Sequence, residues 1–222
     1  YPLRRQRQMC IRDRYNKLLN ELVAYSAQLP PVEHVSYRHR KETDSFYNEM
    51  SDTTGKNEHI RVTRDTSSQQ IVPNGIVMKQ RVADLNVYCP NHPYDYRISI
   101  NTETPVETPK DMDMPKFVRE KDRLSYAQQN FQVDLTQVVM PDRPVEPLHE
   151  LEIEVRDCAY LMQLGYEAQQ TKAGGEHVWT KFEDHVLVLL NNIRLLIRNS
   201  NFGEPTRRFD MSNTSCLLYT SD

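Results

Sequence analysis

The sequence predicts a mainly β protein of the α+β class, whose strands form an antiparallel β-barrel with flanking helices and a charged interior. Three observations predict it. Polar and apolar residues alternate with a period of two from His34 to about Asp157. Helical periodicity precedes and follows this region. Several strands carry charges of a single sign at alternate positions.

The composition limits the function classes. The 222 residues are enough for one sizeable domain, and the formal net charge of −3 excludes a protein coated with basic charge. Any site for a polyanion must therefore be a local concentration of Lys and Arg. No apolar run approaches the roughly 20 residues of a membrane span. The four cysteines show no close spacing, so we expect free thiols in a reducing compartment.

The two ends lack strand or helix periodicity. Residues 1–14 are rich in arginine, and both they and residues 216–222 resemble translated sequencing adapters. An alternative for the first segment is a basic nuclear-localisation or nucleic-acid patch. We therefore expect a non-native tail at 1–14, a barrel domain at 15–170, a C-terminal helix at 171–205 and a tail at 206–222, non-native from 216. Re-reading the transcript at both junctions tests this.

The flanking helices have separate signals. Leu18, Leu19 and Leu22 predict a helix over 15–29, which Pro30 ends. A break at Gly174-Gly175 precedes an amphipathic helix at about 176–199, which is expected to pack on the barrel or on a partner. Trp179, near its start, is interpreted as a core or interface anchor.

The period-two region divides at turn residues. The predicted strands are 33–40, 43–48, 58–65, 75–89, 94–104, 119–128, 131–139 and 149–156. Their breakers include Gly55, Pro73-Asn74-Gly75 and Pro141. Residues 104–117 contain three prolines and several acids, so a long loop is expected there.

The polar faces of these strands are unusually uniform in charge. Pure rows are Arg119, Lys121 and Arg123, and Glu150, Glu152 and Glu154. Like charges two residues apart on a strand lie about 7 Å apart and repel, so such a row needs a solvated face or an opposite row across a ligand. One row alone fits a solvated face, but acidic and basic rows in one chain favour a shared interior.

Such an interior suits phosphate chemistry. Carboxylates hold Mg²⁺ or Mn²⁺, and Arg and Lys neutralise the charge on a transferred phosphoryl group. A spare glutamate could orient the attacking water.

The order of these segments resembles a known family. The matching runs are Lys79 with 81–85, 88–90, 94–101, 121–126, 134–136 and 150–154. They are similar to the motifs of the mRNA-capping enzyme β subunit, the fungal and protozoan RNA 5′-triphosphatase of the triphosphate tunnel metalloenzyme family. The resemblance covers roughly residues 15–165 and is most specific from Lys79 to Glu154.

The resemblance implies an eight-stranded tunnel that uses Mg²⁺ or Mn²⁺ to remove the γ-phosphate from 5′-triphosphate RNA. The diphosphate product would go to the mRNA guanylyltransferase, the capping enzyme α subunit. It also implies nuclear localisation and a homodimer, with no membrane.

The resemblance also implies site residues. The residues expected to face the triphosphate are Arg61, Lys79, Arg119, Lys121 and Arg123, with Arg61 and Lys121 nearest the γ-phosphate. The expected metal site has Glu154 as a direct ligand and Glu150 and Glu152 acting through water, with Glu152 also catalytic. The expected tunnel-wall residues are Asp44, Asp95, Arg97, Glu103, Asp134 and Thr136, of which Arg97, Asp134 and Thr136 also bind substrate.

Two departures from the family pattern affect activity. The family has a Glu-x-Glu strand upstream of the helix at 15–29, and a segment that docks the guanylyltransferase, and neither is found here. We therefore expect weak metal binding and weak or no hydrolysis by this polypeptide, which strong manganese-dependent phosphate release would contradict. Gln132 stands where the family has a basic residue, so lower phosphate affinity is expected there.

Two alternative functions stay open. One is a tunnel-fold inorganic triphosphatase or nucleoside triphosphatase. The other is a catalytically dead scaffold that binds polyanions. A Glu-x-Glu strand in the upstream coding sequence would favour the enzyme.

Overall fold

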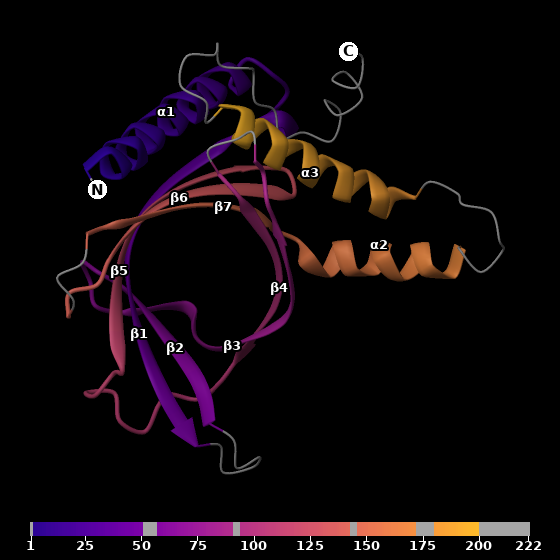
Figure 1. Cartoon of the computed structure of the whole chain (residues 1–222). Helices are drawn as coiled ribbons and strands as arrows, with labels where there is room; N and C mark the ends of the chain where they lie inside the picture. Colours follow the sequence, from indigo (N-terminus) through magenta and orange to yellow (C-terminus); the bar gives the residue numbers. More distant parts are fainter. Residues whose placement is uncertain (1, 51–56, 91–93, 143–145, 172–179, 200–222) are drawn as a thin grey trace. The chain divides into compact units, whose positions relative to one another are not determined.

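The computed structural model describes residues 2–50, 57–90, 94–142, 146–171 and 180–199 (Figure 1). Its elements are, in chain order, α1 (Pro2–Ser26), the 3₁₀ turn η1 (Pro31–Glu33), β1 (Ser36–Met50), β2 (Asn57–Asp65), β3 (Ile71–Val87), β4 (Tyr96–Pro105), β5 (Phe117–Gln128), β6 (Phe131–Val139), β7 (Leu148–Val155), α2 (Cys158–Thr171) and α3 (Lys181–Asn199). Within this part of the chain, no helix is long and apolar enough to cross a membrane.

The strands form one seven-stranded sheet in the order β4-β3-β2-β1-β5-β6-β7. The pairs β1–β2, β2–β3 and β3–β4 are antiparallel, and a two-residue loop joins β5 to β6 as a hairpin. The predicted fold class, antiparallel β with flanking helices, is confirmed. The described part of the chain supplies seven of the eight strands that the resemblance implies.

The chain divides into two compact units. The helical unit comprises Tyr1–Arg38, Ser125–Asp134 and Leu151–Asp222, and the strand unit comprises His39–Leu124 and Leu135–Glu150. The helical unit thus holds α1, α2 and α3, and the strand unit holds β2, β3, β4 and most of β1.

Register gives the strand unit two different faces. Asp44 pairs with Thr63, Arg61 pairs with Val77, and Lys79 pairs with Glu103. Paired residues of antiparallel strands share a face. We call this side the charged face; its members include Glu42, Asp44, Arg61, Thr63, Lys79, Arg81 and Glu103.

The opposite face of these strands is apolar at one end. Tyr47, Ile60 and Val62 are buried there, and Val106 and Met112 of the loop after β4 pack against them. The Tyr47 hydroxyl donates a hydrogen bond to the Met112 carbonyl at 3.0 Å. The predicted loop therefore covers a small core, which leaves the other face of the strands for charge.

The helical unit has its own core. Tyr15 and Leu19 of α1 are buried, as are Phe131 and Val133 of β6. The Tyr126 hydroxyl bonds the side-chain oxygens of Asn16 at 2.6 Å and Asn20 at 2.9 Å, which ties α1 to β5.

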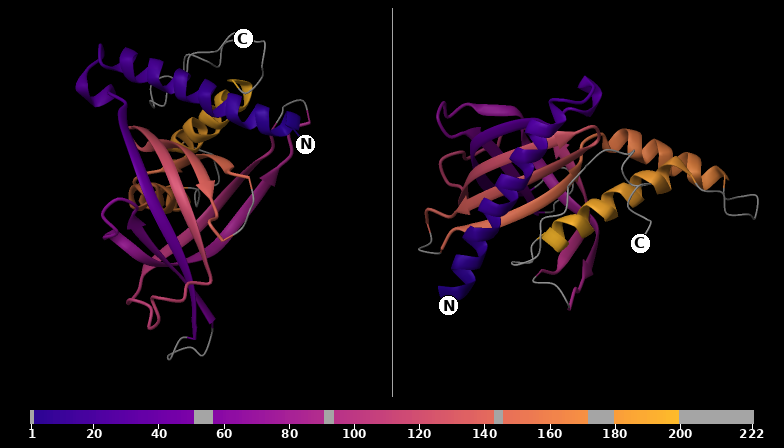
Figure 2. Two further views of the ribbon diagram at one scale, coloured as in Figure 1. Left: turned by 90° about the vertical axis from the view of Figure 1, so that its left-hand side faces the viewer. Right: turned by 90° about the horizontal axis from the view of Figure 1, so that it is seen from above.

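Helices α2 and α3 lie side by side within this unit (Figures 1 and 2). The absence of a side chain at Gly165 allows the approach, since a Cβ there would lie 3.3 Å from the Phe182 ring. The Thr180 hydroxyl and the Glu183 carboxylate cap the start of α3. The predicted apolar stripe is buried at Ile193 and Leu196.

The structure corrects several predicted boundaries. Helix α1 runs from Pro2 to Ser26, so it extends beyond the predicted range at its start and stops short of Pro30. The predicted strands 33–40 and 43–48 are one strand, β1. Two successive charged residues, Lys41 and Glu42, suggest the end of a strand. The strand continues because Glu42 is buried and forms an ion pair with Lys121. Residues 176–179, including Trp179, lie outside the described residues.

Pro73-Asn74-Gly75 do not end a strand as predicted. They lie inside β3, where the register with β2 shifts between Val62 and Arg64. Asn74 has a positive φ of 54°. A Cβ on Gly75 would lie 2.8 Å from the Thr63 carbonyl oxygen, so only glycine fits this close approach.

Candidate functional site

Glu103 joins two cations on the charged face of the strand unit. Its carboxylate lies 3.0 Å from the Arg61 guanidinium and 3.3 Å from the Lys79 ammonium. Burial acts to raise the pKa of Glu103, but the charges of Arg61 and Lys79 and their hydrogen bonds outweigh it, so the pKa lies below its usual 4.5. Glu103 is therefore ionised and holds both cations on one face of β2 and β3.

Lys121 of β5 is the most buried cation of this face. Its ammonium lies 2.8 Å from Asp44 and 3.4 Å from Glu42, and its side chain is only 8% exposed. Asp44 also accepts a hydrogen bond from the Thr63 hydroxyl at 2.6 Å. Because two carboxylates surround one ammonium, the side chain is held in one position.

The other two cations of β5 have different partners. The Arg119 guanidinium lies 2.9 Å from the Glu150 carboxylate of β7. The Arg123 Nε donates to the Thr136 hydroxyl of β6 at 3.1 Å. Alternation predicts one face for Arg119, Lys121 and Arg123. In the structure Arg119 contacts β7, Lys121 contacts β1 and Arg123 contacts β6.

Two arginines of the charged face, Arg61 and Arg119, each have a side-chain N–H group without a hydrogen-bond acceptor in the described part of the chain. The Nε atoms of Arg61 and Arg119 are buried, and neither has a hydrogen-bond acceptor among the described residues. A buried N–H of a charged group without an acceptor is costly, and a phosphate oxygen would satisfy it. The Nε atoms of Arg61 and Arg119 are therefore candidate donors to an oxyanion on the charged face.

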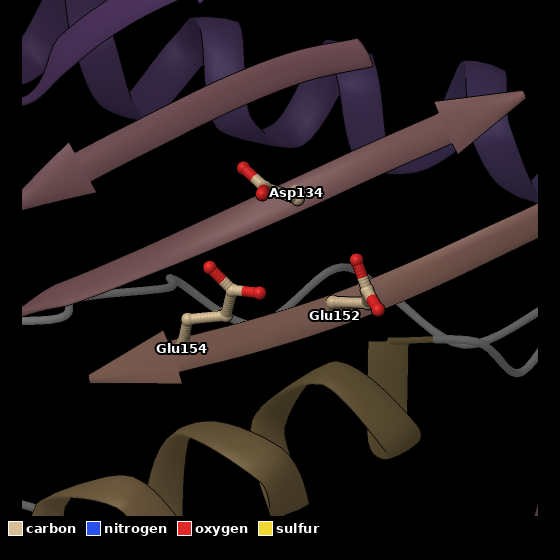
Figure 3. A group of neighbouring side chains, drawn as sticks. All are labelled: Asp134, Glu152 and Glu154. Carbon is tan, nitrogen blue, oxygen red and sulfur yellow. The ribbon is translucent and has the colours of Figure 1, made fainter. Parts of the chain in front are cut away.

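A carboxylate group lies in the helical unit. Asp134 of β6 and Glu152 and Glu154 of β7 place one carboxylate oxygen each within 4.8 Å of the others (Figure 3). Asp134 is fully buried, and Gln132 Nε2 donates to its two oxygens at 3.0 and 3.2 Å. Like charges this close repel, and a divalent cation with hard oxygen preference would relieve that. The donor set fits Mg²⁺ or Mn²⁺.

The predicted site residues separate into these groups. Glu152 and Glu154 lie in the carboxylate group, whereas Glu150 pairs with Arg119, and its role as a metal ligand stays a prediction. Arg97 bonds Asn86 and lies near Asp84. The carboxylate of Asp95 accepts the Cys89 N–H at 2.9 Å, which closes the β3–β4 hairpin.

Three residues of these groups were missed or given another role. The resemblance implies that Asp134 binds substrate, which stays a prediction, and the structure places it beside the two glutamates. Glu42, which lies 3.4 Å from Lys121, has no role predicted from the sequence, and the signal for it is its position two residues before Asp44 on the same strand. Asp84 could not be found from alternation, because a register shift separates it from Arg81.

Known proteins share this arrangement of elements. The family model described as mRNA capping enzyme, beta chain, matches residues 1–201. The chain is similar to the mRNA-capping enzyme subunit beta of Cryptococcus neoformans var. neoformans serotype D, with 39% identity over 189 residues that cover 83% of this chain and 43% of the relative. The Schizosaccharomyces pombe subunit is 35% identical over 188 residues, which cover 82% of this chain and 58% of the relative.

Solved structures agree with these relatives. The structure of S. pombe Pct1 RNA triphosphatase matches with a TM-score of 0.69 and 34% identity, over 85% of this chain and 68% of that one. Pct1 in complex with the Spt5 CTD matches with a TM-score of 0.71 and 33% identity, over 86% and 68% of the two chains. The chain spans about half the length of the curated relatives it matches. It belongs to the family of the mRNA capping enzyme beta chain.

Proposed function

We propose that this protein is an RNA 5′-triphosphatase, an enzyme that removes the γ-phosphate of 5′-triphosphate RNA and leaves a diphosphate end for capping, and that this polypeptide by itself binds the triphosphate end and hydrolyses it weakly or not at all. The observation that carries the proposal is the pair of buried, acceptor-free Nε atoms of Arg61 and Arg119 on a face lined with cations. The names of the relatives and of the solved structures support the same activity.

The cations of the charged face bind and orient the triphosphate in this proposal. Arg61, Lys79 and Lys121 neutralise the charge that spreads over the phosphoryl oxygens. Glu103 and Asp44 act through them, because each carboxylate fixes the position of the cations it contacts. Arg119 and Arg123 are proposed to contact the same polyanion from β5. Because the cations are held in place beforehand, little reorganisation is needed when phosphate binds.

Asp134, Glu152 and Glu154 would hold the Mg²⁺ or Mn²⁺ ion. Such an ion, when bound, neutralises phosphate oxygens and makes water more acidic. Gln132 orients the Asp134 carboxylate through its amide. We propose that Glu152 orients the attacking water, and that Glu150 supports the ligand set from the same strand.

Partners and location follow from the proposed reaction. The diphosphate RNA product would be passed to the mRNA guanylyltransferase, the α subunit of the capping enzyme, in the nucleus. A homodimer is part of the proposal. The S. pombe Pct1 structure with the Spt5 CTD makes a similar peptide a further candidate partner.

The test compares one RNA sequence carrying a 5′-triphosphate, diphosphate or monophosphate. Binding is expected to weaken in that order, because fewer phosphate oxygens reach the cations. The Arg61→Lys and Arg119→Lys variants keep the charge but lose the Nε donor, and each is expected to weaken triphosphate binding about tenfold. Release of labelled γ-phosphate with Mg²⁺ or Mn²⁺ is measured in parallel.

Two results would oppose the proposal. Equal affinity for the three RNA ends would show that the charged face does not recognise the triphosphate. Unchanged binding in both lysine variants would show that the acceptor-free Nε atoms do not contact phosphate. Arg64→Lys is the matched control, because Arg64 lies on the opposite face of β2 from Arg61.

A further inference from the structure

A second pair of cations shares one carboxylate on the charged face. Arg81 Nη1 lies 3.1 Å from Asp84, and Arg97 Nε lies 4.0 Å from the same oxygen. Arg97 Nε also donates to the Asn86 side-chain oxygen at 2.7 Å. The group repeats the arrangement of Arg61, Lys79 and Glu103, with two cations around one anion, so each group retains one positive charge in excess.

A bulge in β3 creates this group. Arg81 pairs with Asn101, but Asp84 pairs with Ser99, because the register with β4 shifts between Arg81 and Ala83. In a regular strand Asp84 would lie on the opposite face from Arg81. The extra residue turns Asp84 toward the charged face, where β4 places Arg97 without any shift.

The second group continues the row of cations toward solvent. Lys79 and Arg81 are two residues apart on one face of β3, a spacing of about 7 Å. The side-chain exposure is 24% for Arg61, 49% for Lys79 and 54% for Arg81. Arg97 on the neighbouring strand β4 is 53% exposed. The row of cations therefore begins at the partly buried Arg61 and ends at the solvent-exposed pair Arg81 and Arg97.

We propose that Arg81 and Arg97 bind backbone phosphates of the nucleotides that follow the 5′-triphosphate. The proposal rests on the proposed function, since it takes the triphosphate to lie at Arg61 and Lys79. Inorganic tripolyphosphate and free nucleoside triphosphates have no further phosphates along a chain. The second group thus favours RNA over these smaller polyanions, and Asp84 weakens that preference by competing for both guanidinium groups.

The test measures two ligands on the same protein. One is a single-stranded RNA of ten nucleotides with a 5′-triphosphate and a dye at its 3′ end, followed by fluorescence anisotropy. The other is inorganic tripolyphosphate, measured as its competitor. In the double variant Arg81→Gln/Arg97→Gln, the ratio of RNA affinity to tripolyphosphate affinity is expected to fall about tenfold. The plot of log affinity against log salt concentration has a negative slope, and its magnitude is expected to fall by about 1.4, or about 0.7 for each lost phosphate contact.

Two further variants complete the test. Lys41→Gln/Arg64→Gln removes the same charge from the opposite face of β1 and β2, and its affinity ratio is expected to stay at the wild-type value. Asp84→Asn removes the competing carboxylate, so RNA affinity is expected to rise. A loss of RNA affinity in Asp84→Asn equal to that of the double glutamine variant would overturn the proposal, because the group would then be structural.

The outcomes separate this inference from the proposed function. If the wild-type chain binds neither the RNA nor tripolyphosphate, both are overturned. If it binds both ligands and the double glutamine variant keeps the wild-type affinity ratio, only the role of Arg81 and Arg97 is overturned. Thermal unfolding of each variant shows whether a changed affinity reflects lost structure.

Discussion

The Lys121 ammonium lies 2.8 Å from the Asp44 carboxylate, and both side chains are almost fully buried. Glu42 adds a second carboxylate at 3.4 Å, and Thr63 donates a hydrogen bond to Asp44. A buried ion pair with satisfied hydrogen bonds contributes little net stability, but removal of one partner leaves an uncompensated buried charge. Lys121 is therefore a structural residue as well as a candidate phosphate ligand.

The first prediction follows from this burial. Lys121→Met is expected to lower the free energy of unfolding by about 3–5 kcal/mol, because the buried Asp44 loses its counter-charge, whereas Glu42 keeps Arg40 at 3.4 Å. Urea denaturation measures it. In the double variant Lys121→Met/Asp44→Asn the loss is expected to be smaller than in Lys121→Met. Lys41→Met is the control, since the 60% exposed Lys41 lies 4.0 Å from Asp122 and should change stability by less than about 1 kcal/mol.

The alternation of the sequence predicted much of the charged face. It placed Lys79 and Arg81 on one face of a strand, and the register with β4 agrees. It also predicted the loop between β4 and β5. Both features can be predicted because the alternation of polar and apolar residues along one strand, and the positions of the prolines, are visible in the sequence itself.

Features that depend on pairing between strands could not be predicted. Glu103 is 42 residues from Arg61 and 24 residues from Lys79 in the sequence, so only the register of the strands brings the three together. The bulge that turns Asp84 toward Arg81 has no Gly or Pro to mark it. The carboxylate group likewise needed the adjacency of β6 and β7, which joins Asp134 to Glu152.

The second prediction concerns Gly75. Gly75→Ala is expected to lower the free energy of unfolding by about 1–3 kcal/mol, because its Cβ would meet the carbonyl oxygens of Val72 at 2.7 Å and Thr63 at 2.8 Å. Both contacts are with backbone, so no side chain can move away. Thermal unfolding measures the change, and an unaltered melting temperature would contradict the close approach.

The third prediction concerns the carboxylate group. Mn²⁺ is expected to stabilise the wild-type chain, by about 2.7 kcal/mol at a hundred times its dissociation constant. Glu152→Gln removes one charged ligand, so the same concentration should give a smaller increase in melting temperature. Glu120→Gln, at an exposed position of β5, is the matched control. Equal increases in Glu152→Gln and wild type would exclude Glu152 from the metal site.

The fourth prediction concerns the pH dependence of Glu103. Its pKa in the folded chain lies below 4.5, so its ionised form stabilises the fold at neutral pH, and this contribution is lost as pH falls through the folded pKa. Glu103→Gln should therefore be less stable than wild type at pH 7, by up to about 1 kcal/mol after solvent screening. The difference should shrink below pH 4.5. A difference that stays constant from pH 7 to pH 3 would argue against the ion pairs with Arg61 and Lys79.

The last prediction concerns Tyr126, whose hydroxyl joins β5 to Asn16 and Asn20 of α1. Tyr126→Phe is expected to lower the free energy of unfolding by about 0.5–1.5 kcal/mol near neutral pH, because the buried hydroxyl loses its hydrogen bonds to the side-chain oxygens of Asn16 and Asn20. Burial, with a smaller effect of Tyr37, raises the pKa of Tyr126 from 10.0 to about 12.

The raised pKa gives this prediction a second readout. An unfolded tyrosine ionises near pH 10, whereas folded Tyr126 stays neutral until about pH 12. The stability contributed by the tyrosine is therefore complete below pH 10 and is lost as pH rises toward 12. Wild type should lose its advantage over Tyr126→Phe across that interval in urea denaturation. Tyr166→Phe, at a position 65% exposed on α2, should follow wild type throughout. If Tyr126→Phe also parallels wild type from pH 9 to pH 12, the buried hydroxyl does not hold α1 against β5.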